Sequence, residues 1–81
     1  MNDIGWYYIY SNDYDFAVLE TIHSTLEHAW NKANDIAERL DGIIEHFDVM
    51  GPFETKKMML KDIISRANEN VEAFRMPPAH D

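Results

Sequence analysis

Two histidines and the glutamate between them are the residues best suited to bind a metal. They occur in residues 23–28, HSTLEH. The zinc-peptidase order His-x-x-Glu-His places both histidines on one face of a helix. Here the spacing is one residue too long, and His23 precedes the helix cap expected at Ser24. We therefore predict no metal site and no cofactor.

The sequence also lacks the common catalytic motifs. It has no cysteine, no Gly-x-Ser-x-Gly sequence and, with only three glycines, no phosphate-binding loop. Carboxylates are numerous, but no pair of them is singled out. A domain of 81 residues also offers little volume for an active site that excludes water. We expect that the protein is not an enzyme.

The carboxylates are concentrated in the first two thirds of the chain. The net charge is −8, and residues 1–54 carry eleven acidic but only two basic residues. Glu27 and Glu38 are eleven residues apart, which is about three helical turns, so they project the same way about 16 Å from each other. Four further acids extend or flank this row: Asp13, Asp15, Asp35 and Asp41. Such a row can imitate the phosphates of DNA. The alternative is a solvated helix face whose charge is partly neutralised by Lys32 and by an Asp35–Arg39 pair.

This charge distribution bears on the kind of partner. Direct binding to nucleic acid is not expected, because such binding depends on Lys and Arg displacing counterions. A basic surface on another protein is the better candidate. The alternative is that the acids serve only solubility.

The aromatic residues are concentrated near the N-terminus. Residues 6–16, WYYIYSNDYDF, hold six of the ten aromatics. In an isolated strand Trp6, Tyr8 and Tyr10 point one way, whereas Tyr7 and Ile9 point the other way. If both helices cover one face of the sheet, large aromatics stay exposed on the other, where they suit a protein partner or a second copy. The alternative is a strand covered by its own helices. The candidate partner-binding residues are Trp6, Tyr8, Tyr10, Asp13, Asp15, Glu27, Asp35, Glu38 and Asp41.

Local patterns predict five elements. Residues 6–10 and 16–22 form a hairpin around a polar turn. A capping box opens a helix at Ser24 that ends near Asp41-Gly42. Residues 43–50 fit either periodicity, and their composition together with the following Gly-Pro favours a strand. Thr55 then caps a second long helix.

These elements predict an α+β fold. We expect a small two-layer sandwich in the order β-β-α-β-α, with two helices on one face of a three-stranded sheet. A single domain spans residues 1–75, and residues 76–81 form a disordered tail. The residues expected to be buried between helices and sheet are Leu26, Trp30, Ala33, Leu60, Ile63, Ile64 and Ala67.

At the level of class, the chain resembles the small accessory proteins of tailed phages and prophages, which are short, acidic, cysteine-free α+β domains. The resemblance implies a non-enzymatic inhibitor that docks an acidic, aromatic-containing surface onto a basic, nucleic-acid-binding surface, as anti-restriction and anti-CRISPR proteins do. The alternative is a homodimeric structural or regulatory module that pairs through its open sheet face. Without cysteines, a signal peptide or a long apolar run, we expect a cytoplasmic protein, in the host cytoplasm if phage-encoded.

Overall fold

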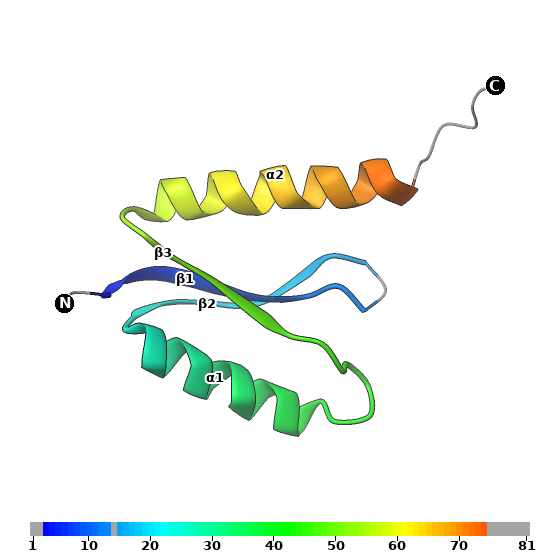
Figure 1. The fold of residues 1–81 in the computed structure, drawn as a ribbon, viewed down its shortest axis with the longest axis horizontal. Helices are drawn as coiled ribbons and strands as arrows, with labels where there is room; N and C mark the ends of the chain where they lie inside the picture. Colours follow the sequence, from blue (N-terminus) through cyan, green and yellow to red (C-terminus); the bar gives the residue numbers. More distant parts are fainter. Residues whose placement is uncertain (1–2, 14, 75–81) are drawn as a thin grey trace.

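The computed structural model describes residues 3–13 and 15–74, so the tail predicted at residues 76–81 lies outside the described residues. The elements follow the predicted order β-β-α-β-α (Figure 1). They are β1 (Gly5–Ser11), β2 (Ala17–Ser24), α1 (Leu26–Arg39), β3 (Asp48–Phe53) and α2 (Lys56–Phe74).

The three strands form one antiparallel sheet with β1 in the centre. The strand order is β2-β1-β3, and both outer strands run antiparallel to β1. β2 and β3 therefore run in the same direction, and α1 is the crossover that carries the chain past β1 from one edge to the other. The α+β class and the three-stranded sheet are confirmed.

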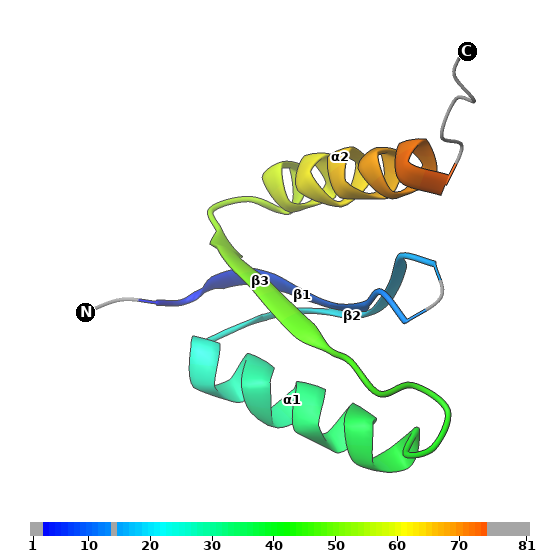
Figure 2. The same cartoon turned by 45° about the vertical axis from the view of Figure 1, so that its right-hand side comes forward.

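The two helices lie on opposite faces of this sheet, so the prediction of two helices on one face of a two-layer sandwich is wrong. Tyr8 and Tyr10 of β1 pack with Met59 of α2. Ile9, which lies between them in the sequence, packs with Ala33 of α1. Successive residues of a strand point to opposite faces, so the two clusters occupy opposite sides of β1. Figures 1 and 2 show the same three layers, with the sheet between the helices.

The composition of β1 explains this arrangement. Both of its faces carry large side chains, and all five residues from Tyr7 to Ser11 are buried. A continuous apolar run is typical of a strand covered on both faces, whereas alternation indicates one covered face. Because α1 covers one face, only α2 is left to cover the other.

β3 starts later than predicted. Residues 43–47 are a connection, and the strand begins at Asp48 and continues through Gly51 and Pro52. A proline is tolerated here because β3 is an edge strand. Gly51 has a φ of +140°, and a Cβ atom at this position would lie 2.6 Å from the carbonyl oxygen of Trp6. Only glycine fits where β3 passes this close to β1.

The helix caps follow local sequence with one shift. Thr25, not Ser24, is the N-cap of α1, and its hydroxyl accepts a hydrogen bond from the backbone N–H of His28 at 3.2 Å. Thr55 caps α2 as predicted, accepting from the N–H of Met58 at 3.1 Å. Gly42 follows α1 with a φ of +85°, the left-handed conformation expected there.

Each helix buries a narrower stripe than predicted. Ala33 is buried, and Ile63 and Ala67 are partly buried. A narrow sheet covers little of a helix, and α1 presents small side chains at Ala29 and Ala33, which let its axis approach the strands closely. The large side chains next to these stripes remain substantially exposed, contrary to prediction: Leu26, Trp30, Leu60 and Ile64.

Candidate functional site

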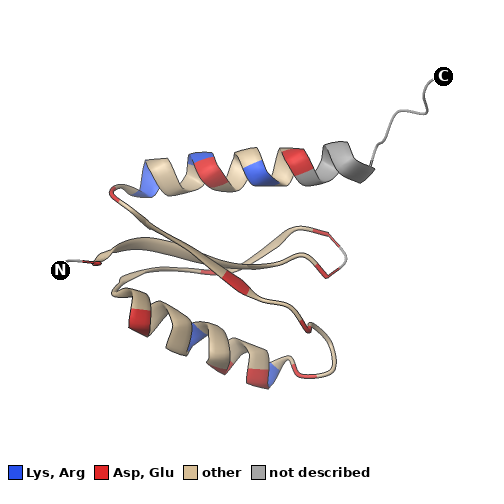
Figure 3. Cartoon of the chain, viewed as in Figure 1, with Lys and Arg blue, Asp and Glu red and all other residues tan. Residues whose placement is uncertain are grey.

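The outward half of α1 carries the acids that the sequence singled out. Glu27, Asp35 and Glu38 are exposed on the helix, and Asp41 is exposed just after it. One shallow hollow is lined by Asp35, Glu38 and Asp41 together with neighbouring residues of the helix. Glu27 lies outside this hollow, in the first turn of α1. Figure 3 shows acidic residues on both helices, on the strands and in the loops, and basic residues on both helices.

One of these acids is paired within the helix. Asp35 accepts from Arg39 at 3.1 Å, and both side chains are more than half exposed. An exposed i,i+4 pair of this kind contributes only about 0.3–0.5 kcal/mol. Breaking this pair therefore costs little.

Two large apolar side chains lie beside these acids. Trp30 and Leu26 are each 39% exposed, which contradicts the burial predicted for them. In a helix, Glu27 is three residues before Trp30 and therefore its neighbour on the surface. We define the α1 surface as the exposed acids of this helix, Asp41 just after it, and the two apolar side chains; it comprises Leu26, Glu27, Trp30, Asp35, Glu38 and Asp41.

The aromatics of β1 are not part of an exposed surface. Tyr8 and Tyr10 are 0% and 7% exposed, and Trp6 is half-buried against the same cluster under α2. The expectation that Tyr8 and Tyr10 lie exposed on an open sheet face is wrong, because α2 covers that face. Trp30 of α1 is instead the exposed aromatic next to carboxylates.

A polar network between β1 and α2 was not predicted from the sequence. The hydroxyl of Tyr8 donates to Asp62 Oδ2 at 2.5 Å and accepts from Arg66 Nε at 3.0 Å. The Arg66 guanidinium also lies over the Tyr10 ring, 5.3 Å from its centroid. The hydroxyl of Tyr10 reaches Asp48 Oδ2 at 3.4 Å. These contacts join residues more than 30 positions apart.

Burial and this network change the pKa of the tyrosines. Desolvation, followed by the hydrogen bond to Asp62, raises the pKa of Tyr8 to about 12. Desolvation and then the charge of Asp48 raise the pKa of Tyr10. The hydrogen bond with Tyr8 is the main cause that raises the pKa of Arg66. All three groups thus keep their protons at neutral pH, and the network is structural.

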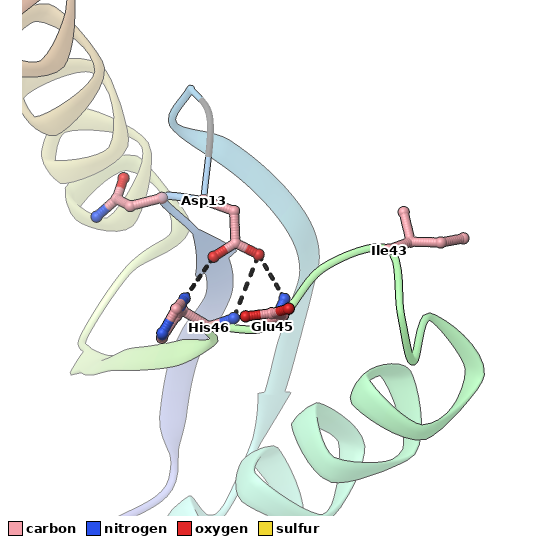
Figure 4. A pocket seen from close by; sticks show the side chains of 5 residues that line it. Asp13, Ile43, Glu45 and His46 are labelled. Carbon is pink, nitrogen blue, oxygen red and sulfur yellow. Dashed lines mark hydrogen bonds and ion pairs between the residues drawn. The ribbon is translucent and has the colours of Figure 1, made fainter.

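Asp13 faces the protein, whereas Asp15 is exposed. The Oδ1 atom of Asp13 lies 2.6 Å from His46 Nδ1, and its Oδ2 accepts from the backbone N–H groups of Glu45 and His46 at 2.5 and 3.3 Å (Figure 4). We call these contacts the Asp13–His46 latch. It ties the turn between β1 and β2 to the connection between α1 and β3. Asp13 is therefore a structural residue here, and its carboxylate is not directed at a partner.

The latch shifts the pKa of both partners. Desolvation raises the pKa of Asp13, but the hydrogen bonds from the His46 ring and from the two amides together outweigh it, so the pKa is lowered. The hydrogen bond to Asp13 and then its charge raise the pKa of His46. His46 is 80% exposed on its side chain, whereas Asp13 is 11% exposed.

A histidine oriented by a carboxylate is also part of catalytic triads, but a triad needs a nucleophile in reach of the ring. The hollow at the latch is lined by Asn12, Asp13, Ile43, Glu45 and His46, and none of these supplies a hydroxyl or thiol. The geometry of the described residues supports a latch.

The histidine segment shows no metal-binding geometry. Within residues 3–13 and 15–74, no group of three His, Asp or Glu side chains could hold a metal ion. His23 instead packs edge-on against Trp6, with ring centroids 5.1 Å apart.

In the same described part of the chain, no helix is long and apolar enough to cross a membrane. The chain matches no family model, no curated protein and no solved structure.

Proposed function

We propose that this protein is a non-enzymatic binding module that docks the α1 surface onto a basic surface of another protein. The observation that carries the proposal is an exposed tryptophan, Trp30, on the same exposed helical half as Glu27 and Glu38. Tryptophan is enriched at the energetic centres of interfaces, and charged residues around it set orientation and association rate.

The chemistry of the surface indicates the class of partner. Glu27 and Glu38 lie about 16 Å apart along one side of α1, with Asp41 beyond them. This is a row of negative charge on a convex helix, which complements a groove that binds nucleic acid. We therefore propose an inhibitor of a nucleic-acid-binding protein, acting in the cytoplasm in the manner of phage anti-restriction or anti-CRISPR proteins.

A capture experiment with matched variants tests this function. The immobilised protein is exposed to a bacterial lysate at low and at high salt. We expect salt-sensitive capture of a nucleic-acid-binding protein. Glu27→Gln combined with Glu38→Gln should slow its association roughly three- to tenfold at low salt, with a smaller effect as salt rises.

The matched control is Glu54→Gln combined with Glu69→Gln. Both control residues are exposed and lie outside α1, so the change in net charge is the same. If the control pair slows association equally, overall charge and not the α1 surface governs binding. If neither pair has an effect on any captured protein, the proposed docking surface is wrong.

Trp30→Ala separates the apolar contact from the charges. Because Trp30 is partly exposed, the variant should remain folded, and it should raise the dissociation rate of the captured partner. An unchanged dissociation rate would exclude Trp30 from the interface.

A further inference from the structure

The outward side of α2 carries a second exposed stripe, with the opposite charge. Lys57, Leu60, Lys61 and Ile64 occupy positions i, i+3, i+4 and i+7, which lie on one face of a helix. Leu60 is 45% exposed and Ile64 is 60% exposed, and both lysines are exposed. We call these four residues the α2 surface.

The α1 and α2 surfaces are complementary. Each has an exposed apolar centre: Trp30 on α1, and the Leu60–Ile64 pair on α2. Glu27 lies one turn before Trp30 and Glu38 about two turns after it, whereas Lys57 and Lys61 lie one turn before Leu60 and Ile64. Helices pack with axes about 8–10 Å apart when side chains of one fill the spaces on the other. Trp30 laid between Leu60 and Ile64 would bring Glu27, its neighbour on the helix surface, within reach of a lysine.

A chain cannot make this contact within itself. The two helices lie on opposite faces of the sheet, which separates the two surfaces (Figures 1 and 2). The complement of the α1 surface is nevertheless present on every copy of the protein. From this we infer that a second copy of this chain binds the α1 surface through its α2 surface. The inference rests on the proposed function and names one basic partner for the same surface.

The geometry also predicts the type of assembly. A contact between α1 of one copy and α2 of another is heterologous, and it leaves one free surface at each end of the pair. Further copies can therefore add, giving short oligomers or a closed ring. One helix stripe is a small interface, so association should be weak, with a dissociation constant on the order of 0.1 mM.

Sedimentation velocity at low salt tests the assembly. The protein concentration is varied between 10 and 500 µM, about 0.1 to 5 times the expected dissociation constant. Wild-type protein should show a sedimentation coefficient that rises with concentration and falls back in high salt. Two charge-reversal variants, Glu27→Lys with Glu38→Lys and Lys57→Glu with Lys61→Glu, should each stay monomeric. The first variant keeps only Asp35 and Asp41 as acids on its α1 surface and places two lysines among them, and the second makes both of its surfaces acidic.

An equimolar mixture of the two variants gives the decisive result. The reversed α1 surface of one now complements the reversed α2 surface of the other, and their unchanged surfaces also complement each other. We expect the mixture to associate as the wild type does. Glu54→Lys with Glu69→Lys is the control, which changes the charge equally outside both surfaces and should still self-associate.

Several outcomes would overturn the inference. The first is a wild-type protein that remains monomeric at 500 µM, about five times the expected dissociation constant. The second is a mixture of the two folded variants that does not associate. The third is a control variant, Glu54→Lys with Glu69→Lys, that no longer associates. Far-UV circular dichroism establishes that each variant is folded, and Ile64→Ala gives a second, uncharged test that should weaken association. If wild-type protein is monomeric but Glu27 and Glu38 still govern capture of another protein, self-association fails and the proposed function stands.

Discussion

Replacing Tyr8 by phenylalanine tests whether the polar network between β1 and α2 stabilises the fold. Tyr8 is fully buried, and its hydroxyl is the group that both Asp62 and Arg66 contact. Asp62 Oδ2 and Arg66 Nη2 are otherwise 3.9 Å apart. The substitution removes one oxygen, keeps the ring, and leaves both charged groups without this partner.

The size of the effect follows from the exposure of these partners. A hydrogen bond to a charged group contributes about 1.5–3 kcal/mol when its partner would otherwise be left unsatisfied. The side chains of Asp62 and Arg66 are 34% and 32% exposed, so water can replace part of the lost contact. We therefore expect Tyr8→Phe to lower the free energy of unfolding by about 1–2 kcal/mol, which for a domain of this size lowers Tm by about 4–16 °C.

Urea denaturation followed by circular dichroism measures this loss. Tyr10→Phe is the matched control, because it removes a hydroxyl whose bond to Asp48 is long, at 3.4 Å, and we expect it to cost less than about 0.5 kcal/mol. A difference of less than about 0.5 kcal/mol in the free energy of unfolding between Tyr8→Phe and wild type would refute the prediction. It would mean that the cost of desolvating the charged groups cancels the stabilisation from their hydrogen bonds.

The pH dependence gives an independent check on Tyr8. Its folded pKa of about 12 lies above the ordinary value of 10.0. A raised folded pKa stabilises the protein below the unfolded pKa, and this contribution is lost as pH rises through the folded value. The stability difference between wild type and Tyr8→Phe should therefore narrow from pH 10 to pH 12.

Two further predictions concern the latch and the core. In Asp13→Ala, the pKa of His46 should fall toward its ordinary value, as an NMR titration would show, and the backbone amides of Glu45 and His46 should exchange faster. Protonated His46 favours the folded state below about pH 6.5, and ionised Asp13 favours it above about pH 4. The latch therefore contributes most to stability between these two pH values. An unchanged His46 titration in Asp13→Ala would contradict the latch. Met59→Ala should cost about 2–3 kcal/mol because Met59 is fully buried, whereas Ile64→Ala should cost less than 1 kcal/mol. Equal losses in thermal unfolding would mean that α2 packs on a different face.

Local features of the fold were predictable because they depend on neighbouring residues. The hairpin turn, the Thr55 cap and the left-handed Gly42 each follow from side chains and backbone preferences within a few positions. The exposure of Glu27 and Glu38 follows from the same helical periodicity, so the acidic part of the α1 surface was visible in the sequence. The element order came from these local patterns alone.

The placement of the helices depended on contacts between distant residues. The uninterrupted apolar run of β1 did carry a signal that both faces are buried. Periodicity leaves the rotation of a helix uncertain by about one residue, which corresponds to about 100°. This is why Trp30 and Ile64 were expected inside and lie on the flanks.

The polar contacts depended entirely on tertiary structure. Tyr8 meets Asp62 and Arg66, and Asp13 meets His46, across 33 to 58 positions in the chain. No local pattern encodes such pairs, because their geometry exists only after the sheet and helices have packed. The sequence alone determined which residues carry charge and, to within one residue, where the helices begin. Packing decided which of those charges hold the fold together and which remain exposed.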